Sequence, residues 1–139
     1  MSSWEKVYTV TDSEGPSPLT GAADCGGKPH LYSRVFSEAD QEYADEYRLM
    51  EIDPDLLALL IEDFQIFLRW RAAFDGRAAQ LNTHPALPDD KAHHEVLKAA
   101  IGDRDRLVVE KSKLMCPRFK RFAEFEFEVM WEPVREPSG

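Results

Sequence analysis

Histidine and cysteine are the side chains of this chain best suited to chemistry near neutral pH, and their spacing argues against a metal centre. His93, His94 and Glu95 are consecutive, and consecutive residues on a helix diverge by about 100°. A helix presents ligands on one face at spacings of three or four residues, and zinc sites use such spacings or close cysteine pairs. His84 does not complete such a pattern, so the sequence predicts neither a metal nor another cofactor.

Cys25 and His30 form the one arrangement that resembles a nucleophile with its base. Gly26-Gly27 lies between them, and a Gly-Gly pair between extended segments predicts a two-residue hairpin that brings the two arms together. Nucleophilic catalysis also needs a third group that orients the base. Asp24 is the nearby choice, but side chains alternate along a strand, which points it away from Cys25. The sequence favours a protein that is not an enzyme and leaves an enzymatic function open.

A second set of polar and aromatic residues defines an alternative function. A hairpin and a long helix could enclose a pocket that contains two histidines, which serve as acid or base near pH 7. The residues of this predicted pocket are Asp24, His30, Tyr32, Trp70 and His84. The alternative is therefore a small-molecule-binding protein or an enzyme. Whether His30 and His84 share one site is not decided by the sequence.

Negative charge is concentrated in the first half of the chain and indicates a basic partner. Residues 1–70 carry 14 Asp and Glu against 5 Lys and Arg, whereas residues 71–139 carry 12 of each. An acidic surface repels nucleic acids and anionic membranes and attracts basic proteins. The sequence predicts a small acidic protein-interaction module, comparable by charge alone to an inhibitor or immunity-like protein. The expected partner-binding residues are Glu38, Asp40, Glu42, Tyr43, Asp45, Glu46 and Tyr47.

A basic and aromatic segment near the C-terminus is the main argument for nucleic acid. Cations and aromatic rings together can bind phosphates and stack bases. The segment contains Lys111, Lys113, Arg118, Phe119, Lys120, Arg121 and Phe122. Binding to phosphates requires a positive local potential, and the acidic half of the chain opposes it. The sequence therefore disfavours nucleic acid as a partner.

Strand and helix signals that would position these residues alternate along the chain. The predicted strands are 7–12, 22–25, 28–36, 46–52 and 122–131, with an exposed loop over 13–21 and a polar connection over 37–45. Pro54 at a first helical position predicts a long helix that ends at Gly76, and a second helix covers 88–101. Residues 107–115 fit a strand or a helix. Strands followed by helices indicate an α+β fold, with a mostly antiparallel sheet packed on a long central helix plus a second helix.

Chain length, cysteine content and hydropathy predict the number of domains and the cellular location. A chain of 139 residues predicts a single globular domain, here with residues 133–139 as a flexible tail. Two distant cysteines indicate reduced thiols and a cytoplasmic protein. The N-terminus lacks the pattern of a signal peptide, and charges interrupt the apolar stretch 56–70, so no membrane span is predicted. A homodimer through the apolar helix and the strand 125–131 is left open.

Three sequence segments carry a resemblance to a known group of proteins. They read WxKVYTVTD from Trp4, GxADxxGxPHxY from Gly21 and THPALP from Thr83. This pattern resembles a group of short bacterial proteins without an assigned function, over the chain up to about Glu95. The resemblance implies a bacterial cytosolic protein and implies nothing about a substrate.

Overall fold

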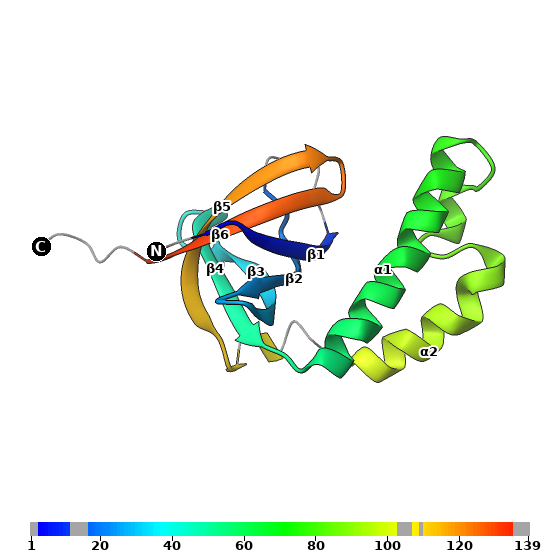
Figure 1. Cartoon of the computed structure of the whole chain (residues 1–139). Coiled ribbons are helices and arrows are strands. Elements are labelled where there is room, and N and C mark those ends of the chain that lie inside the picture. Colours follow the sequence, from blue (N-terminus) through cyan, green and yellow to red (C-terminus); the bar gives the residue numbers. More distant parts are fainter. Residues whose placement is uncertain (1–2, 12–16, 103–106, 109, 135–139) are drawn as a thin grey trace, which may run out of the picture. The chain divides into compact units, whose positions relative to one another are not determined.

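The chain forms two compact units in a computed structural model that describes residues 3–11, 17–102, 107–108 and 110–134. Met1–Asp53 and Asp103–Gly139 make the first, which we call the barrel unit. Pro54–Gly102 makes the second, the helical unit, which is inserted between two strands of the first. Figure 1 shows the strands of one unit and the helices of the other.

The barrel unit is a closed barrel of six antiparallel strands in chain order. The strands are β1 (Glu5–Thr11), β2 (Thr20–Cys25), β3 (Lys28–Ser37), β4 (Glu42–Glu51), β5 (Lys113–Ala123) and β6 (Glu126–Pro133). The last strand returns to the first, where Glu5 lies opposite Val129 and Lys6 opposite Glu128. Closure pairs the first strand with the last, which would be the two free edges of an open sheet.

The predicted fold class is therefore wrong. The expected sheet packed on a long central helix is a sheet that closes on itself, and the long helix belongs to the helical unit. The physical reason is the size of the inward side chains. Tyr32, Tyr47 and Trp131 are 1%, 1% and 5% exposed, and Phe119 packs against them. In a barrel of few strands such side chains fill the interior.

Hydrogen bonds fix the two buried tyrosines in the barrel core. The Tyr32 hydroxyl donates to the main-chain oxygen of Thr9 at 3.0 Å, and the Tyr47 hydroxyl donates to that of Pro18 at 2.7 Å. Gly21 makes room for this arrangement, because a Cβ there would collide with the Thr9 oxygen and the Tyr32 hydroxyl. Buried hydroxyls need partners of this kind.

Several element boundaries differ from the sequence expectation. The predicted connection 37–45 is a tight turn, because β3 continues to Ser37 and β4 begins at Glu42. The predicted strand 122–131 is the end of β5, a turn at Glu124 and Phe125, and β6. Residues 20–21 of the predicted loop belong to β2, while residues 12–16 lie outside the described part. The predicted tail 133–139 begins at the last residue of β6. Its residues 135–139 lie outside the described part of the chain.

Other local expectations are confirmed. Gly26 and Gly27 form the two-residue turn between β2 and β3, with φ angles of 64° and 76° that suit glycine. The ambiguous segment 107–115 combines both structures, since Leu107, Val108 and Glu110 are helical and β5 begins at Lys113.

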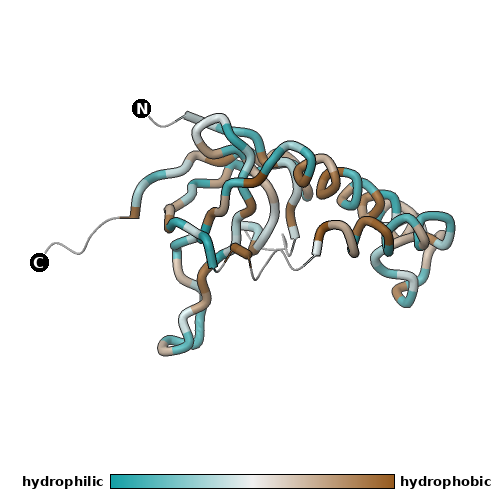
Figure 2. Tube along the Cα trace, turned by 90° about the horizontal axis from the view of Figure 1, so that it is seen from below, coloured by the Kyte–Doolittle hydropathy of each residue, from teal (hydrophilic) through white to brown (hydrophobic). Residues whose placement is uncertain are grey.

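The helical unit contains the two predicted helices. α1 spans Pro54–Asp75 and α2 spans Lys91–Ile101, with short 3-10 turns η1 (Leu81–Thr83) and η2 (Pro88–Asp90) between them. Figure 2 shows hydrophobic and hydrophilic residues interleaved along both helices, as expected of helices with one apolar face. No helix in the described part of the chain is long and apolar enough to cross a membrane.

Candidate functional site

The β3–β4 hairpin extends past its neighbouring strands and carries the strongest candidate binding surface. We call residues 35–46 the acidic ribbon. Five acidic residues and no Lys or Arg lie between Ser37 and Tyr47. Four of the five, Glu38, Asp40, Glu42 and Asp45, are exposed, and Glu46 is half-buried. The ribbon therefore presents a concentrated negative charge to solvent.

An exposed aromatic pair lies within this charged surface. Phe36 of β3 and Tyr43 of β4 are 46% and 45% exposed, and their ring centroids are 5.1 Å apart in an edge-to-face arrangement. Large aromatic side chains at this exposure are favoured anchors in protein interfaces. Tyr43 was among the predicted binding residues, and Phe36 was missed because its segment was interpreted as an ordinary strand face.

Arg34 stabilises the base of the acidic ribbon. Its Nε donates to the main-chain oxygen of Ala44 at 2.7 Å, and its guanidinium lies 3.6 Å from Asp45 Oδ1. The same group lies over the ring of Tyr43, 5.8 Å from the centroid. A guanidinium thus lies within reach of one acid and one ring of the ribbon.

The tip of the ribbon is ordered by its own hydrogen bonds. Ser37 Oγ donates to Asp40 Oδ2 at 3.1 Å, and Gln41 Nε2 donates to the main-chain oxygen of Glu38 at 2.6 Å. Gln41, the last residue of the turn, takes a φ of 55°, in the left-handed region. A preformed tip reduces the entropy that a partner must overcome on binding.

Tyr47, one of the predicted partner-binding residues, follows the acidic ribbon and lies in the barrel core. Its side chain is 1% exposed and contacts the rings of Tyr32, Phe119 and Trp131. Tyr43 and Tyr47 are both on β4, but only Tyr47 lies where the strand forms the barrel wall. The exposed aromatic group of the ribbon is therefore Phe36 with Tyr43.

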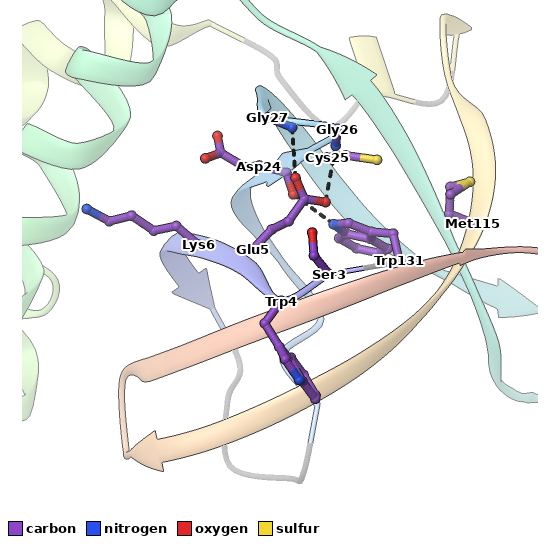
Figure 3. Close-up of a pocket in the computed structure, with 10 residues that line it drawn as sticks. All are labelled: Ser3, Trp4, Glu5, Lys6, Asp24, Cys25, Gly26, Gly27, Met115 and Trp131. Carbon is purple, nitrogen blue, oxygen red and sulfur yellow. Dashed lines mark hydrogen bonds between the residues drawn. The ribbon is translucent and has the colours of Figure 1, made fainter. Parts of the chain in front are cut away.

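A separate pocket, which we call the Glu5 pocket, opens beside the Gly26-Gly27 turn (Figure 3). It has a volume of about 760 Å³ and is lined by Ser3, Trp4, Glu5, Lys6, Asp24, Cys25, Gly26, Gly27, Met115 and Trp131. The Glu5 carboxylate accepts hydrogen bonds from the N–H groups of Gly26 at 3.1 Å and Gly27 at 2.8 Å. Figure 3 shows the Trp4 ring pointing away from this carboxylate.

The polar groups of this pocket are largely engaged within the fold. The Tyr8 hydroxyl donates to both Asp24 carboxylate oxygens at 3.0 and 2.9 Å. Burial, and then the adjacent Asp24, raise the pKa of Tyr8. Burial also raises the pKa of the Cys25 thiol, which opposes formation of the reactive thiolate at neutral pH. The pocket suits binding better than covalent catalysis.

The five residues of the predicted histidine pocket belong to the two separate units. Asp24, His30 and Tyr32 are in the barrel unit, where His30 is 3% exposed and its Nδ1 lies 2.8 Å from the main-chain oxygen of Lys28. Trp70 and His84 are in the helical unit and contact each other edge-on at 4.7 Å between centroids. Their convergence on one site stays a prediction. Across the hairpin, Cys25 lies opposite Lys28 and His30 opposite Ala23.

The other candidate histidines pair with carboxylates across the helical unit. His93 Nε2 lies 2.7 Å from Glu62 Oε1, and His94 Nδ1 lies 2.5 Å from Asp63 Oδ1. Within the described residues, no group of three or more His, Cys, Asp and Glu side chains is placed to hold a metal ion. These pairs have a clear structural use in joining α1 to α2.

The basic segment of β5 is also occupied by contacts within the barrel unit. Lys120 lies between the rings of Trp4 and Phe122, 5.5 and 5.4 Å from their centroids, and Arg118 is 3.7 Å from Glu132. Glu128 of β6 lies opposite Lys120. These neighbouring acids reduce the positive potential that phosphates would require.

Comparisons with known proteins add no relative. No family model, curated protein or solved structure matches the chain. The resemblance to short bacterial proteins stays a prediction, and the functional argument depends on the geometry above.

Proposed function

We propose that the protein is a binding module that docks a basic protein through the acidic ribbon. The observation that carries the proposal is the exposed Phe36–Tyr43 pair on a hairpin whose residues 38–46 include five acids and no Lys or Arg, with Arg34 at its base as the neighbouring cation. The charges would accelerate the encounter with a basic surface, and the aromatic pair would supply the desolvated centre of the interface. This chemistry fits an inhibitor or immunity-like protein that binds a basic enzyme. We place that role in the bacterial cytoplasm.

The test measures the affinity of two charge-reversed variants for a lysine-rich peptide by isothermal titration calorimetry. The ribbon variant carries Glu38→Lys, Glu42→Lys and Asp45→Lys. The matched control carries Asp89→Lys, Glu95→Lys and Glu126→Lys, which are exposed positions outside the ribbon and change the net charge equally. We expect the ribbon variant to bind at least about tenfold more weakly, since exposed charges contribute up to about 1 kcal/mol each. Equal weakening in both variants would show attraction to net charge alone and would contradict the proposal.

The aromatic pair provides a second test. Phe36→Ser with Tyr43→Ser leaves the charge of the ribbon unchanged and removes its apolar centre. We expect the association rate to change little and the dissociation rate to rise, because steering depends on charge and residence depends on packing. Trp4→Ser is a matched control, because Trp4 is 41% exposed but lies outside the ribbon.

A small ligand in the Glu5 pocket is the alternative function. Its volume of about 760 Å³ is within the range of small-molecule sites, about 300–1,000 Å³. Amide chemical shifts separate the two functions. A ligand in the pocket perturbs Gly26 and Gly27, whereas a docked basic protein perturbs residues 36–46.

A further inference from the structure

We propose that the outer edge of β4, from Glu42 to Glu46, accepts an extended segment of the basic partner as an added antiparallel strand. This inference rests on the proposed function and specifies how the partner binds. The acidic side chains would select the partner by charge, while the main chain of β4 would hold it by hydrogen bonds. Strand addition to a sheet edge is a recurring mode of peptide recognition.

The edge is open because β5 leaves β4 after three residue pairs. Among the described residues, β4 pairs with β5 only where Tyr47, Arg48 and Leu49 lie opposite Met115, Leu114 and Lys113. The other edge of β5 pairs with β6 over a longer stretch, from Met115 to Ala123. Within 42–46, Glu42 and Tyr43 lie opposite Ser37 and Phe36 of β3, and residues 44–46 lie in the register shift between Arg34 and Phe36. In the described part of the chain, no strand is paired with 42–46 on the side away from β3, which leaves this edge open to an added strand.

Two local features explain why the ladder between β4 and β5 stops there. If the ladder continued past Tyr47 and Met115, Pro117 of β5 would lie opposite Asp45 of β4. Proline has no N–H to donate to a neighbouring strand. On the other side, the register of β3 and β4 shifts between Arg34 and Phe36. Such a bulge bends a strand and increases its twist, which separates the ribbon from the path of β5.

The charge of this edge identifies its occupant. Edges of sheets are commonly guarded by charged side chains and bulges, and Glu42–Glu46 has three acids and lies at the register shift of β3 and β4. Two copies of the ribbon would place like charges side by side, which opposes pairing of the chain with itself. A basic strand would instead be attracted by the acids of the ribbon. The occupant is therefore an extended segment with Lys or Arg at alternate positions.

Arg34 indicates the contacts that such a segment would make. Its guanidinium is placed between the Asp45 carboxylate and the Tyr43 ring, and both groups retain exposed surface, with the Asp45 side chain fully exposed. A cation of the added strand would reach the same two groups from the outer side. Apolar residues at the intervening positions would face the opposite side of the ribbon, since side chains alternate along a strand.

The experiment separates main-chain pairing from charge attraction by changing the ligand instead of the protein. The probe is a capped peptide of alternating Lys and Val. The control peptide has the same sequence with an N-methyl group on every residue, which removes the N–H donors from both of its edges and retains every charge. Binding is measured by titration, and protection of the amides of residues 43–46 is measured by hydrogen exchange.

We expect the unmodified peptide to slow exchange at residues 43–46 and the methylated peptide to bind about tenfold or more weakly. Equal binding of the two peptides, or protection elsewhere in the chain, would overturn strand addition and leave the docking function standing. Failure of both peptides to bind, with no difference between the charge-reversed variants, would overturn both. Light scattering tests the remaining outcome, a dimer in which a second copy of the chain occupies the edge, and a dimer would overturn the proposed occupant.

Discussion

The indole N–H of Trp131 donates a hydrogen bond to the main-chain oxygen of Asp24, at 2.9 Å and across 107 residues of sequence. The bond connects β6 to the end of β2, beside the Gly26-Gly27 turn. It joins the last strand of the barrel to a strand that is not its neighbour in the sheet. Trp131 lines the Glu5 pocket and belongs to the core cluster of the barrel, so this bond connects the pocket to the core.

Replacement of Trp131 by Phe tests that connection. Trp131→Phe removes the N–H donor and part of a ring that is 5% exposed, so we expect a loss of about 2 kcal/mol in the free energy of unfolding. Urea denaturation provides the measurement. Trp4→Phe, at a 41% exposed ring, should change stability by less than about 0.5 kcal/mol. Equal effects of the two substitutions would contradict a special role for Trp131.

Gly21→Ala should be among the most damaging single substitutions in the barrel. The added methyl would collide with the Thr9 oxygen and the Tyr32 hydroxyl, which are hydrogen-bonded to each other. We expect a loss of about 3 kcal/mol or more, as for an overpacked core. Gly27→Ala meets no atom within 4 Å and bears only the strain of its positive φ, about 1–2 kcal/mol. Thermal unfolding of both variants distinguishes collision from backbone strain.

Glu5 should control the mobility of the β2–β3 turn. Glu5→Ala removes the acceptor for the N–H groups of Gly26 and Gly27, and we expect both amides to exchange with solvent faster. Because the turn is exposed, the global stability should change by less than about 1 kcal/mol. The measurement is hydrogen exchange by nuclear magnetic resonance. Glu126→Ala is the control, and unchanged exchange in Glu5→Ala would show that the carboxylate does not hold the turn.

The two histidine–carboxylate pairs of the helical unit should differ in strength. His94 and Asp63 have side chains that are 13% and 22% exposed, whereas those of His93 and Glu62 are 50% and 53% exposed. Solvent weakens the more exposed pair. A double-mutant cycle with Ala substitutions should therefore give a coupling of about 1 kcal/mol for His94–Asp63 and less than about 0.5 kcal/mol for His93–Glu62. The reverse order would contradict the assigned packing.

The buried tyrosines predict a loss of stability at alkaline pH. Burial raises the pKa of Tyr47 from 10.0 to about 12, so the folded state favours the neutral phenol. The corresponding stability is fully present below pH 10, the unfolded-state value, and is lost as the pH rises toward 12. Unfolding free energies measured across this range should fall less steeply in Tyr47→Phe than in the native protein. An unchanged slope would contradict the burial of this hydroxyl.

Local signals in the sequence predicted the elements that local interactions decide. The Gly26-Gly27 turn requires positive φ at two positions, which glycine supplies, and Pro54 begins a helix where its missing N–H has no cost. Closure of the barrel has no such signal, because Glu5 and Val129 are distant in sequence and either sheet edge could have stayed open. The sequence therefore predicted the strands better than their arrangement.

In and beside the acidic ribbon, local sequence signals also fail to predict which single residues are exposed. Tyr43 and Tyr47 are four positions apart on β4, so the period of a strand predicts one shared environment. In the structure Tyr43 is 45% exposed and Tyr47 is 1% exposed. The difference depends on where β5 stops accompanying β4, and that point is set by contacts between strands. Asp24 lines the Glu5 pocket, which is a different pocket from the histidine pocket predicted for it. Glu5 was missed because nothing in its own segment indicates the glycine turn it contacts.

The insertion of the helical unit between β4 and β5 also has a consequence for the nascent chain. Leaving the ribosome in order, the first four strands emerge before Pro54–Gly102, and β5 and β6 emerge after it. During that interval β4 has no β5 beside it, and β1 has no β6. An unpaired strand is an aggregation hazard on a crowded polysome. The acids of β4 would then keep neighbouring nascent chains apart until the barrel can close.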